Sequence, residues 1–296
     1  MRVKLDFTPL SMERMEEYSE LFALSKEKAS DYSFINIWGW SEERRYEWAF
    51  GNGLCWLLLT SGVEPVYWAP VGDWDRADWL ELMRGLFAPG TVFERTPQAL
   101  ADIWVERMGE HVRLEEQRSE WEYLYSYKAM ATLSGNKMHK KKNLLNQFVK
   151  LYDYVYAPIC PKCIGVIREM QHEWYEWRGC EESPGLTAEN IAIARVLDQW
   201  ENLPGILGGS LSVGGKTIAY TVAEDLGNGV VVIHFEKGLD TYKGVYQAIN
   251  QMFLANTSGF EIVNREQDMG FQGIRQAKES YNPVGFLKKY RVHWLG

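Results

Sequence analysis

Apolar residues recur at helical spacing in several stretches of the chain. Between residues 161 and 177, Ile164, Ile167, Met170 and Trp174 fall on one stripe, which is the spacing of an amphipathic helix. Comparable patterns predict a helix opened by Thr8-Pro9, a helix capped by Thr187, and helices over Asp31–Trp40, Asp75–Phe87, Thr96–Gly109, Lys137–Leu151, Lys243–Ala255 and Phe271–Lys278.

Apolar runs without helical spacing predict strands. The longest run, Leu54–Thr60, is too short to cross a membrane and is typical of a buried strand. Turns such as Gly214-Gly215 separate the runs as hairpin connections. The predicted strands are Arg45–Phe50, Leu54–Thr60, Pro65–Ala69, Thr91–Phe93, Val112–Glu116, Trp121–Tyr125, Tyr152–Ala157, Ile206–Val213, Lys216–Glu224, Gly229–Glu236, Phe260–Val263 and Phe286–His293.

The order of these elements is the same in both halves of the chain. Each half has helices, three antiparallel strands, a helix, a strand, a helix and a strand, which is an antiparallel meander that leads into a βαβ crossover. This is the order of the GNAT fold, so we expect an α+β protein of two tandem GNAT-like domains. A length of 296 residues also favours two domains, which we place at residues 1–126 and 127–296, with the first as a scaffold.

Composition and charge narrow the class of protein. The net charge of −8 disfavours non-specific nucleic-acid binding by the whole surface, although a local basic patch can still bind. Four cysteines are too few for a disulfide scaffold and suit a reducing compartment. The first residues lack the apolar core of a secretory leader. We therefore expect a cytoplasmic protein without a membrane span, with peripheral membrane contact left open.

Basic residues gather at the start of one predicted helix. Lys137, Lys140, Lys141 and Lys142 stand within about one helical turn and are followed by Asn143. Cations are unfavourable at a helix N-terminus unless an anion lies nearby. Lys140, Lys141 and Asn143 are therefore candidates to dock a phosphate of a cofactor, an RNA or a lipid headgroup. The alternative is a solvated helix face.

A second candidate is the turn between the strand Gly229–Glu236 and the helix that follows it. Tyr242, Lys243 and Gly244 open that helix, where free backbone N–H groups can bind an anion. GNAT enzymes seat the pyrophosphate of CoA on the equivalent turn. Tyr246 stands where their pattern has a second small residue, so an ordinary strand–helix turn is the alternative.

The densest polar segment follows the strand predicted at Phe260–Val263. Glu266 and Asp268 are candidate general bases for an amine nucleophile. The candidate substrate-binding residues are Asn264, Arg265, Arg275, Lys278 and Tyr281. Polar side chains at this end of a strand are where open α/β sheets bind ligands. The alternative is an internal network of ion pairs that ties the last helix to the sheet.

The cysteines and histidines form no recognised site. Cys160 and Cys163 flank a helix start, and His172 and Cys180 follow at spacings that match no common zinc pattern. A redox pair is conceivable, but small buried cysteines are the favoured interpretation, and no metal site is predicted. His234, on a predicted central strand, is expected to be a core histidine with a satisfied hydrogen bond.

Several of these segments together resemble a largely uncharacterised bacterial family that is similar to the C-terminal domain of phosphatidylglycerol lysyltransferase. The resemblance spans nearly the whole chain, and 264–283 is its most specific part. The segments are Asp31-Tyr32-Ser33-Phe34, Leu133-Ser134-Gly135, Lys140-Lys141-Lys142-Asn143 with Phe148, His234-Phe235-Glu236-Lys237, Asn264-Arg265-Glu266-Gln267-Asp268-Met269-Gly270 and Arg275-Gln276-Ala277-Lys278-Glu279-Ser280-Tyr281-Asn282-Pro283.

The resemblance implies a tandem GNAT fold that is distantly similar to the Fem-type peptidyltransferases, which use aminoacyl-tRNA as donor. The expected activity is transfer of an acyl or aminoacyl group from acyl-CoA or aminoacyl-tRNA to an amine or hydroxyl acceptor. A tRNA or CoA donor is thus the expected partner, and no tightly bound cofactor is firmly implied. The alternative is a non-catalytic GNAT-like module that binds or senses a nucleotide, an RNA or a lipid headgroup.

Overall fold

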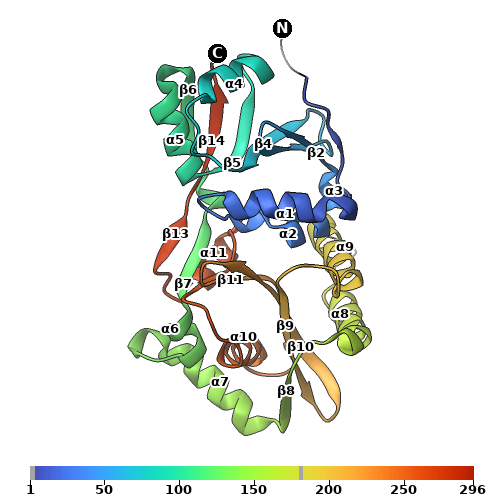
Figure 1. Ribbon diagram of the computed structural model, residues 1–296. Coiled ribbons are helices and arrows are strands. Elements are labelled where there is room, and N and C mark those ends of the chain that lie inside the picture. The colour runs from blue at the N-terminus through green and yellow to red at the C-terminus, as the bar shows by residue number, and fades with distance from the viewer. Residues whose placement is uncertain (1–3, 180–182) are drawn as a thin grey trace. The chain divides into compact units, whose positions relative to one another are not determined.

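Two seven-stranded mixed sheets, each flanked by helices, organise the chain. The structure is a computed structural model and describes residues 4–179 and 183–296 (Figure 1). Its contacts divide the chain into two compact units. Unit 1 holds the described residues up to Glu122 together with Gln267–Gly270 and Leu287–Gly296, and unit 2 holds Tyr123–Glu266 and Phe271–Phe286. The predicted α+β class is confirmed.

Unit 1 contains sheet A, whose strand order is β1-β2-β3-β4-β5-β14-β6. The strands are β1 (Thr8–Pro9), β2 (Tyr46–Gly51), β3 (Leu54–Leu59), β4 (Val66–Gly72), β5 (Val92–Pro97), β6 (Val112–Glu116) and β14 (Lys289–Trp294). The helices are α1 (Met15–Leu24), α2 (Phe34–Gly39), α3 (Ser41–Arg44), α4 (Trp79–Leu86) and α5 (Gln98–Met108), with short 3-10 turns at Met12–Arg14, Ser30–Tyr32, Gly109–His111 and Arg118–Glu120.

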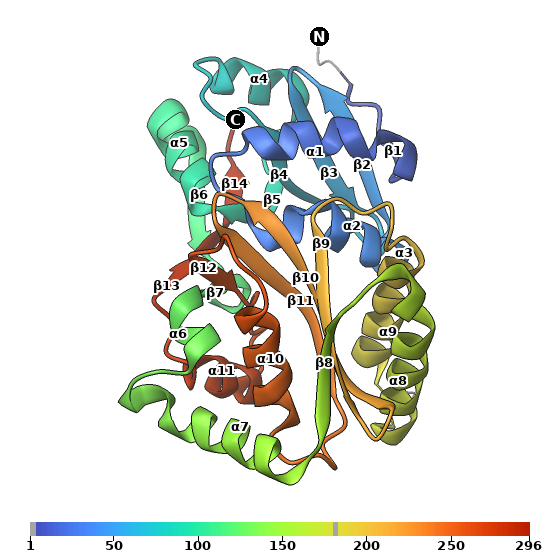
Figure 2. The same ribbon diagram turned by 60° about the horizontal axis from the view of Figure 1, so that its bottom comes forward.

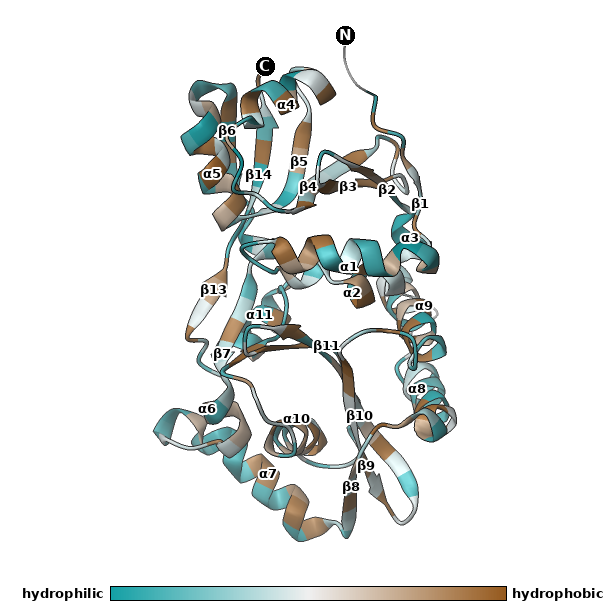
Figure 3. Ribbon diagram, viewed as in Figure 1, coloured by the Kyte–Doolittle hydropathy of each residue, from teal (hydrophilic) through white to brown (hydrophobic). Residues whose placement is uncertain are grey.

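Large aromatic side chains fill the core of unit 1. All six residues of β3 are buried, as the apolar run predicts. Trp79 of α4 and Trp104 of α5 meet edge to face at 5.5 Å, and Phe93 of β5 packs against Trp104 at 5.3 Å. Aromatic pairs of this kind add to the free energy of area burial. In Figure 3 the strand β3 is coloured largely as hydrophobic.

Unit 2 contains sheet B, whose order is β13-β7-β12-β11-β10-β9-β8. The strands are β7 (Glu122–Ser126), β8 (Tyr154–Pro158), β9 (Ile206–Val213), β10 (Lys216–Gly227), β11 (Val230–Gly238), β12 (Ile262–Asn264) and β13 (Gly285–Leu287). The helices are α6 (Tyr127–Thr132), α7 (His139–Leu151), α8 (Ile164–Trp177), α9 (Pro184–Asp198), α10 (Val245–Ala255) and α11 (Gln272–Glu279), with 3-10 turns at Asn136–Met138 and Pro161–Cys163.

Helices cover both faces of sheet B. Figure 2 shows α8 and α9 on one side of β9–β11 and α10 on the other. Helix α10 also packs against α6 and α7, so α7 reaches the sheet through α10. Helix α9 begins at Pro184, three residues before the predicted cap Thr187, because proline suits the first helical position.

Both sheets contain the predicted meander and crossover. Strands β2, β3 and β4 are antiparallel, and β5 then lies parallel to β4. Likewise β9, β10 and β11 are antiparallel, and β12 then lies parallel to β11. Each unit is therefore a GNAT-like domain in its strand order.

The strand beside each crossover comes from the other half of the sequence. In sheet A, β14 from the C-terminus lies between β5 and β6. In sheet B, β7 from the first half lies between β12 and β13. The single strand predicted at Phe286–His293 is thus two strands, β13 in sheet B and β14 in sheet A, which separate at Lys288. The units are consequently discontinuous in sequence.

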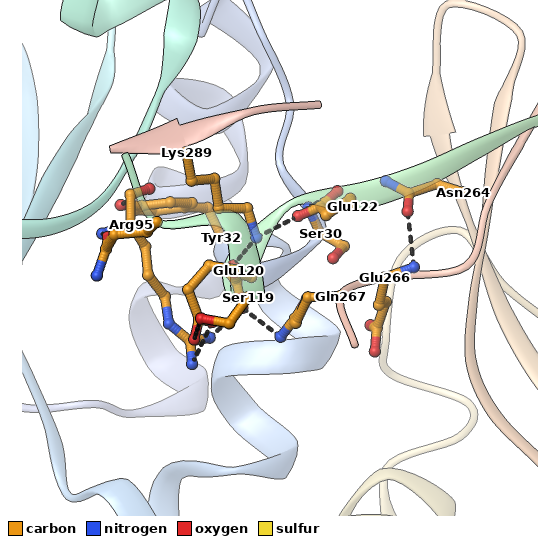
Figure 4. A network of polar contacts seen from close by, with 12 residues as sticks. Ser30, Tyr32, Arg95, Ser119, Glu120, Glu122, Asn264, Glu266, Gln267 and Lys289 are labelled. Atoms are coloured by element: carbon orange, nitrogen blue, oxygen red, sulfur yellow. Dashed lines mark hydrogen bonds and ion pairs between the residues drawn. The ribbon is translucent and has the colours of Figure 1, made fainter. Parts of the chain in front are cut away.

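A buried ion network holds β14 in unit 1 (Figure 4). The Nζ atom of Lys289 pairs with Glu122 at 2.6 Å and also with Asp31, and neither Lys289 nor Glu122 is exposed. Arg95 pairs with Asp31 and with Glu120. Burial would raise the pKa of Asp31, but the positive charges of Arg95 and Lys289 outweigh it and hold this pKa below its usual range.

Candidate functional site

Polar side chains of unit 2 gather where the parallel strands β11 and β12 part. Strand β12 pairs with β11 only along Val230–Val232, while β11 continues to Gly238. On the other side of β11, Ala223 and Val222 of β10 pair with Ile233 and Phe235. His234 is therefore the extra residue of a β-bulge, which can redirect a side chain beside a functional site.

His234 is clamped between two glutamates. Its Nε2 lies 2.8 Å from Oε2 of Glu224, and its Nδ1 lies 2.9 Å from Oε1 of Glu266. The imidazole is 2% exposed. Burial alone would lower the pKa of His234, but the hydrogen bonds and charges of the two carboxylates raise it to about 9. The ring is consequently an imidazolium at neutral pH. The sequence predicts a core histidine with a satisfied hydrogen bond, and the structure adds a positive charge held by two carboxylates.

The backbone around Glu266 is fixed by several hydrogen bonds. Glu266 has a left-handed φ of 56°. Its N–H donates to Oδ1 of the buried Asn264 at 2.9 Å, as Figure 4 shows. Its carbonyl oxygen accepts from Nζ of Lys278 at 3.0 Å and from the N–H of Tyr123 at 3.2 Å. These contacts aim a carboxylate that is 21% exposed and therefore reachable by a substrate.

Two cations face the ring of Tyr281. The Nζ atom of Lys141 lies 4.2 Å from the ring centroid, and Cζ of Arg265 lies 5.0 Å from it. Tyr281 is 6% exposed, and burial raises the pKa of its hydroxyl. The fold thus brings together three residues that the sequence places in two separate candidate segments.

The two cations differ in their partners. Arg265 is paired with Oε1 of Glu236 at 3.1 Å, and Oε2 of Glu236 accepts from Asn250 at 2.8 Å. Within residues 4–179 and 183–296, Lys141 has no carboxylate at ion-pair distance, and its ammonium group faces the ring of Tyr281. Partial burial and the charge of Arg265 lower the pKa of Lys141. Lys141 therefore offers an unsatisfied positive charge beside a paired one.

The remaining basic candidates lie at the edges of this cluster. Lys140 and Asn143 are exposed on α7, and the amide of Asn143 lies 3.3 Å from the ring of His139. Arg275 lies partly exposed on α11. Lys278, which the sequence places on the same helix face as Arg275, donates to the carbonyl oxygens of Arg265 and Glu266. Lys278 therefore fixes the site backbone from α11.

The turn at Tyr242, Lys243 and Gly244 packs against α7. Gly244 has a φ of 82°, and a Cβ placed on it would lie 2.3 Å from the carbonyl oxygen of Leu144. The N–H of Lys243 donates to the hydroxyl of Tyr152 at 3.1 Å, and the ring of Tyr242 packs on that of Tyr152 at 5.2 Å. Close helix packing accounts for this glycine without a bound phosphate.

Asp268, the second candidate base, belongs to unit 1. Its side chain is 0% exposed, and Oδ1 accepts from the N–H of Gly270 at 2.8 Å. Oδ2 lies 3.4 Å from an Nη atom of Arg118. The carboxylate of Asp268 therefore binds groups of the segment Gln267–Gly270 and of Arg118 in unit 1, whereas Glu266 belongs to unit 2.

Two further residues of the cluster, Glu224 and Glu236, are absent from the predicted site. Glu236 lies in the quoted segment His234–Lys237, and its polar character within an apolar strand is a usable signal. Glu224 carries no such signal, because its contact with His234 depends on the register of β10 against β11 and on the bulge.

Cys160 and Cys163 differ from the predicted buried state. Cys160 is exposed and Cys163 is partly exposed at the start of the helical segment that leads into α8. The chain reverses here from β8 into a surface helix, so these side chains stay outside the core. Cys180, the last of the four residues weighed as a zinc set, lies outside the described residues.

The strand order of the two sheets defines a class, the tandem GNAT-like proteins with an acyltransferase-like fold. The sequence profile of one family, described as "Phosphatidylglycerol lysyltransferase, C-terminal", matches residues 22–293. The chain belongs to this family, as its resemblance predicts.

Several solved structures are similar to this chain in fold. A conserved protein of unknown function from Bacteroides thetaiotaomicron is similar in structure, with a TM-score of 0.86, 26% identity and coverage of 97% of this chain and 99% of that one. The C-terminal domain of a putative lysylphosphatidylglycerol synthetase from Agrobacterium fabrum has a TM-score of 0.65, 12% identity and coverage of 97% and 93%. FemX has a TM-score of 0.62, 6% identity and coverage of 98% of both chains. The last two likenesses show the fold alone.

A curated relative is an uncharacterized protein of Mycoplasmoides gallisepticum, which is 28% identical over 176 residues. The match spans 57% of this chain and about half, 55%, of that protein. In the described part of this chain, none of the helices has the length and apolar character needed to span a bilayer.

Proposed function

We propose that the chain is an acyltransferase that moves an acyl or aminoacyl group from aminoacyl-tRNA or acyl-CoA to an amine or hydroxyl acceptor. The observation that carries the proposal is the cluster in unit 2, where the cations Lys141 and Arg265 share the ring of Tyr281. Membership in a lysyltransferase family favours an aminoacyl donor, so aminoacyl-tRNA is the first donor to test. Unit 1, with its buried ion network, serves as the scaffold.

Lys141 is the proposed contact for a donor phosphate. A partly buried ammonium group without a carboxylate partner is unfavourable, and an anionic ligand would relieve that cost. Both donors are anionic: aminoacyl-tRNA carries phosphates in its RNA backbone, and acyl-CoA carries them in its nucleotide part. Lys140 and Asn143, exposed on the same helix, extend this contact along α7.

The turn at Gly244 is a weaker candidate for a CoA pyrophosphate. The space beside Gly244 is filled by the backbone of Leu144, and the N–H groups of Lys243 and Val245 already donate within the protein. A phosphate at this helix start would find fewer free donors than a usual anion site provides. This geometry favours a donor whose phosphates bind at α7 and Arg265. Because the turn that would seat the pyrophosphate of CoA is already filled, aminoacyl-tRNA is the favoured donor.

Glu266 is the proposed general base. Its carboxylate accepts the proton of the acceptor amine or hydroxyl while the new bond to the acyl carbon forms and the donor oxygen or sulfur leaves. His234 acts as a positioning residue, because its ring donates to Glu266 and is itself anchored by Glu224. Asn264 and Lys278 orient the backbone at the same position.

Binding and turnover of the full chain test the proposal. Thermal unfolding is followed with deacylated tRNA and with CoA, since a ligand that binds the folded state raises the melting temperature. Turnover is followed as loss of the acyl group from labelled aminoacyl-tRNA or acyl-CoA in the presence of amine and hydroxyl acceptors. The proposal fails if neither donor shifts the melting temperature and neither is consumed.

Matched variants assign the roles. Lys141→Met should weaken donor binding, whereas Lys142→Met, the exposed neighbour on α7, should not. Glu266→Gln should keep binding and lose turnover, with the exposed Glu261→Gln as its control. Binding by the wild type without turnover of either donor supports the alternative, a GNAT-like module that senses RNA or a nucleotide.

A further inference from the structure

A pair of thiols lies outside the proposed site, at the start of the helical segment 161–177. The Sγ atoms of Cys160 and Cys163 face each other at 2.6 Å. Cys160 is exposed and Cys163 is partly exposed, so a reagent in solution can reach the pair. Neither residue takes part in the contacts described for unit 2 above.

The surrounding backbone holds the two sulfurs together. The N–H of Ile159 donates to the carbonyl oxygen of Gly208 at 2.9 Å, which anchors the chain on β9 just before Cys160. The N–H of Cys163 donates to the carbonyl oxygen of Cys160 at 2.8 Å. Pro161 occupies the first helical position and restricts the backbone there. Proximity fixed by the fold favours reaction between the two groups.

The local charges make the two thiols unequal. The hydrogen bond from the Cys163 thiol lowers the pKa of Cys160, and the N–H groups of Cys163 and Lys162 act in the same direction. The same contact raises the pKa of Cys163. By contrast, burial raises the pKa of Cys55 well above its usual value. The thiolate is the reactive form, so Cys160 is the expected nucleophile.

We propose that Cys160 and Cys163 are a redox-active dithiol that exchanges with small-molecule disulfides. The Cys160 thiolate attacks one sulfur of the small disulfide, forms a mixed disulfide and releases one thiolate. The Cys163 thiolate then attacks Sγ of Cys160, which forms the intramolecular disulfide and releases the second thiolate. The protein pair is oxidised and the small disulfide is reduced. The two protons lost by the cysteine thiols are taken up by the two released thiolates, which end as thiols.

The full chain is incubated with oxidised glutathione as the probe, the remaining thiols are alkylated, and the peptides are weighed. We expect the peptide that spans 160–163 to escape alkylation at both cysteines and to be lighter by two hydrogen atoms. Dithiothreitol should restore both alkylated cysteines. Alkylation of both cysteines at all ratios of oxidised to reduced glutathione would overturn the proposal.

Single variants separate the two roles. Cys163→Ser should stop at a mixed disulfide on Cys160. Cys160→Ser should give no internal disulfide and should react more slowly at Cys163, because Cys163 is only partly exposed. Cys55→Ser and Cys180→Ser should leave the internal disulfide unchanged. Loss of the internal disulfide in Cys180→Ser, or equal rates in the two single variants at 160 and 163, would contradict the assignment.

Discussion

The ammonium group of Lys289 lies 2.6 Å from Oε1 of Glu122, and neither side chain is exposed to solvent. Glu122 also accepts two hydrogen bonds from the backbone N–H of Ser30, at 2.9 and 3.1 Å. A strand from the C-terminus of the chain is thus tied by charge to a segment near its beginning. Removing one partner leaves an uncompensated buried charge.

Lys289→Met should therefore destabilise the protein strongly. Breaking a buried ion pair by removing one partner costs about 3–5 kcal/mol, and Lys289 has two acidic partners. Urea unfolding followed by tryptophan fluorescence measures the loss of unfolding free energy. The signal reports on unit 1, because the tryptophans that are fully buried among the described residues, Trp48, Trp56, Trp68, Trp79, Trp104 and Trp294, all lie there. Adding Glu122→Gln to Lys289→Met should recover part of it, because the orphaned charge is removed.

The neighbouring lysine provides the control. Lys288 lies 4.9 Å from the ring of Trp121 and is only partly buried. Lys288→Met should cost less than about 1 kcal/mol, the scale of an exposed cation–π contact. Equal losses in the two variants would show that the strand, and not the buried charge, sets the stability.

The exchange of strands predicts which fragments fold. A fragment of residues 123–286 contains all strands of sheet B except for the end residues Glu122 of β7 and Leu287 of β13, whereas a fragment of residues 127–296 lacks β7 entirely. We expect the first fragment to unfold cooperatively in urea and the second to be largely unfolded, since β12 would lose β7, one of its two neighbours. Circular dichroism decides this, and a cooperative transition in 127–296 alone would contradict it.

The order of elements could be read from the sequence, but the partners of the strands could not. Local spacing predicts the crossover units, because each is built from consecutive segments. The exchange of β7 and β14 depends on contacts over more than a hundred residues, and β13 runs into β14 across Lys288 without a turn signal. The charged residue Lys289 within an otherwise strand-like segment is the one local signal. It can be interpreted only once its acidic partners Asp31 and Glu122, far away in the sequence, are known.

Gly244→Ala should destabilise unit 2. The new Cβ would lie 2.3 Å from the carbonyl oxygen of Leu144, and the φ of 82° is unfavourable for alanine. Strain and overpacking together should cost about 3 kcal/mol in urea unfolding. Gly273→Ala in α11 is the matched control, because nothing lies within 4 Å of its Cβ position. That change should be neutral or stabilising by up to about 1 kcal/mol.

Most residues of the candidate site could be predicted from the sequence, but the contacts that bring them together could not. The polar density of 264–281 marks Glu266, Arg265 and Tyr281 directly. Lys141 joins them only because α7 folds against α10. Asp268 stands two residues after Glu266 in the sequence, yet the chain passes from one unit to the other between them. No local pattern reveals such a passage.

The clamped histidine predicts a specific pH dependence of stability. The folded pKa of His234, about 9, lies above its value of 6.5 without these partners. The folded state therefore binds the proton more tightly, and the stabilisation is complete below pH 6.5 and is lost as the pH rises through 9. Since one pKa unit corresponds to about 1.4 kcal/mol, the free energy of unfolding should fall across this window by up to about 3 kcal/mol.

Urea unfolding of the wild type and of His234→Gln at a series of pH values measures this effect. The variant is expected to be less stable at pH 6.5, because the buried Glu224 and the partly exposed Glu266 lose their shared cation, and its stability should change little up to pH 9. His172→Gln is the control, since the side chain of His172 is 72% exposed beside Glu176. That variant should follow the wild-type curve. A wild-type stability that stays flat or rises between pH 6.5 and 9 would mean that Glu224 and Glu266 do not hold a proton on His234.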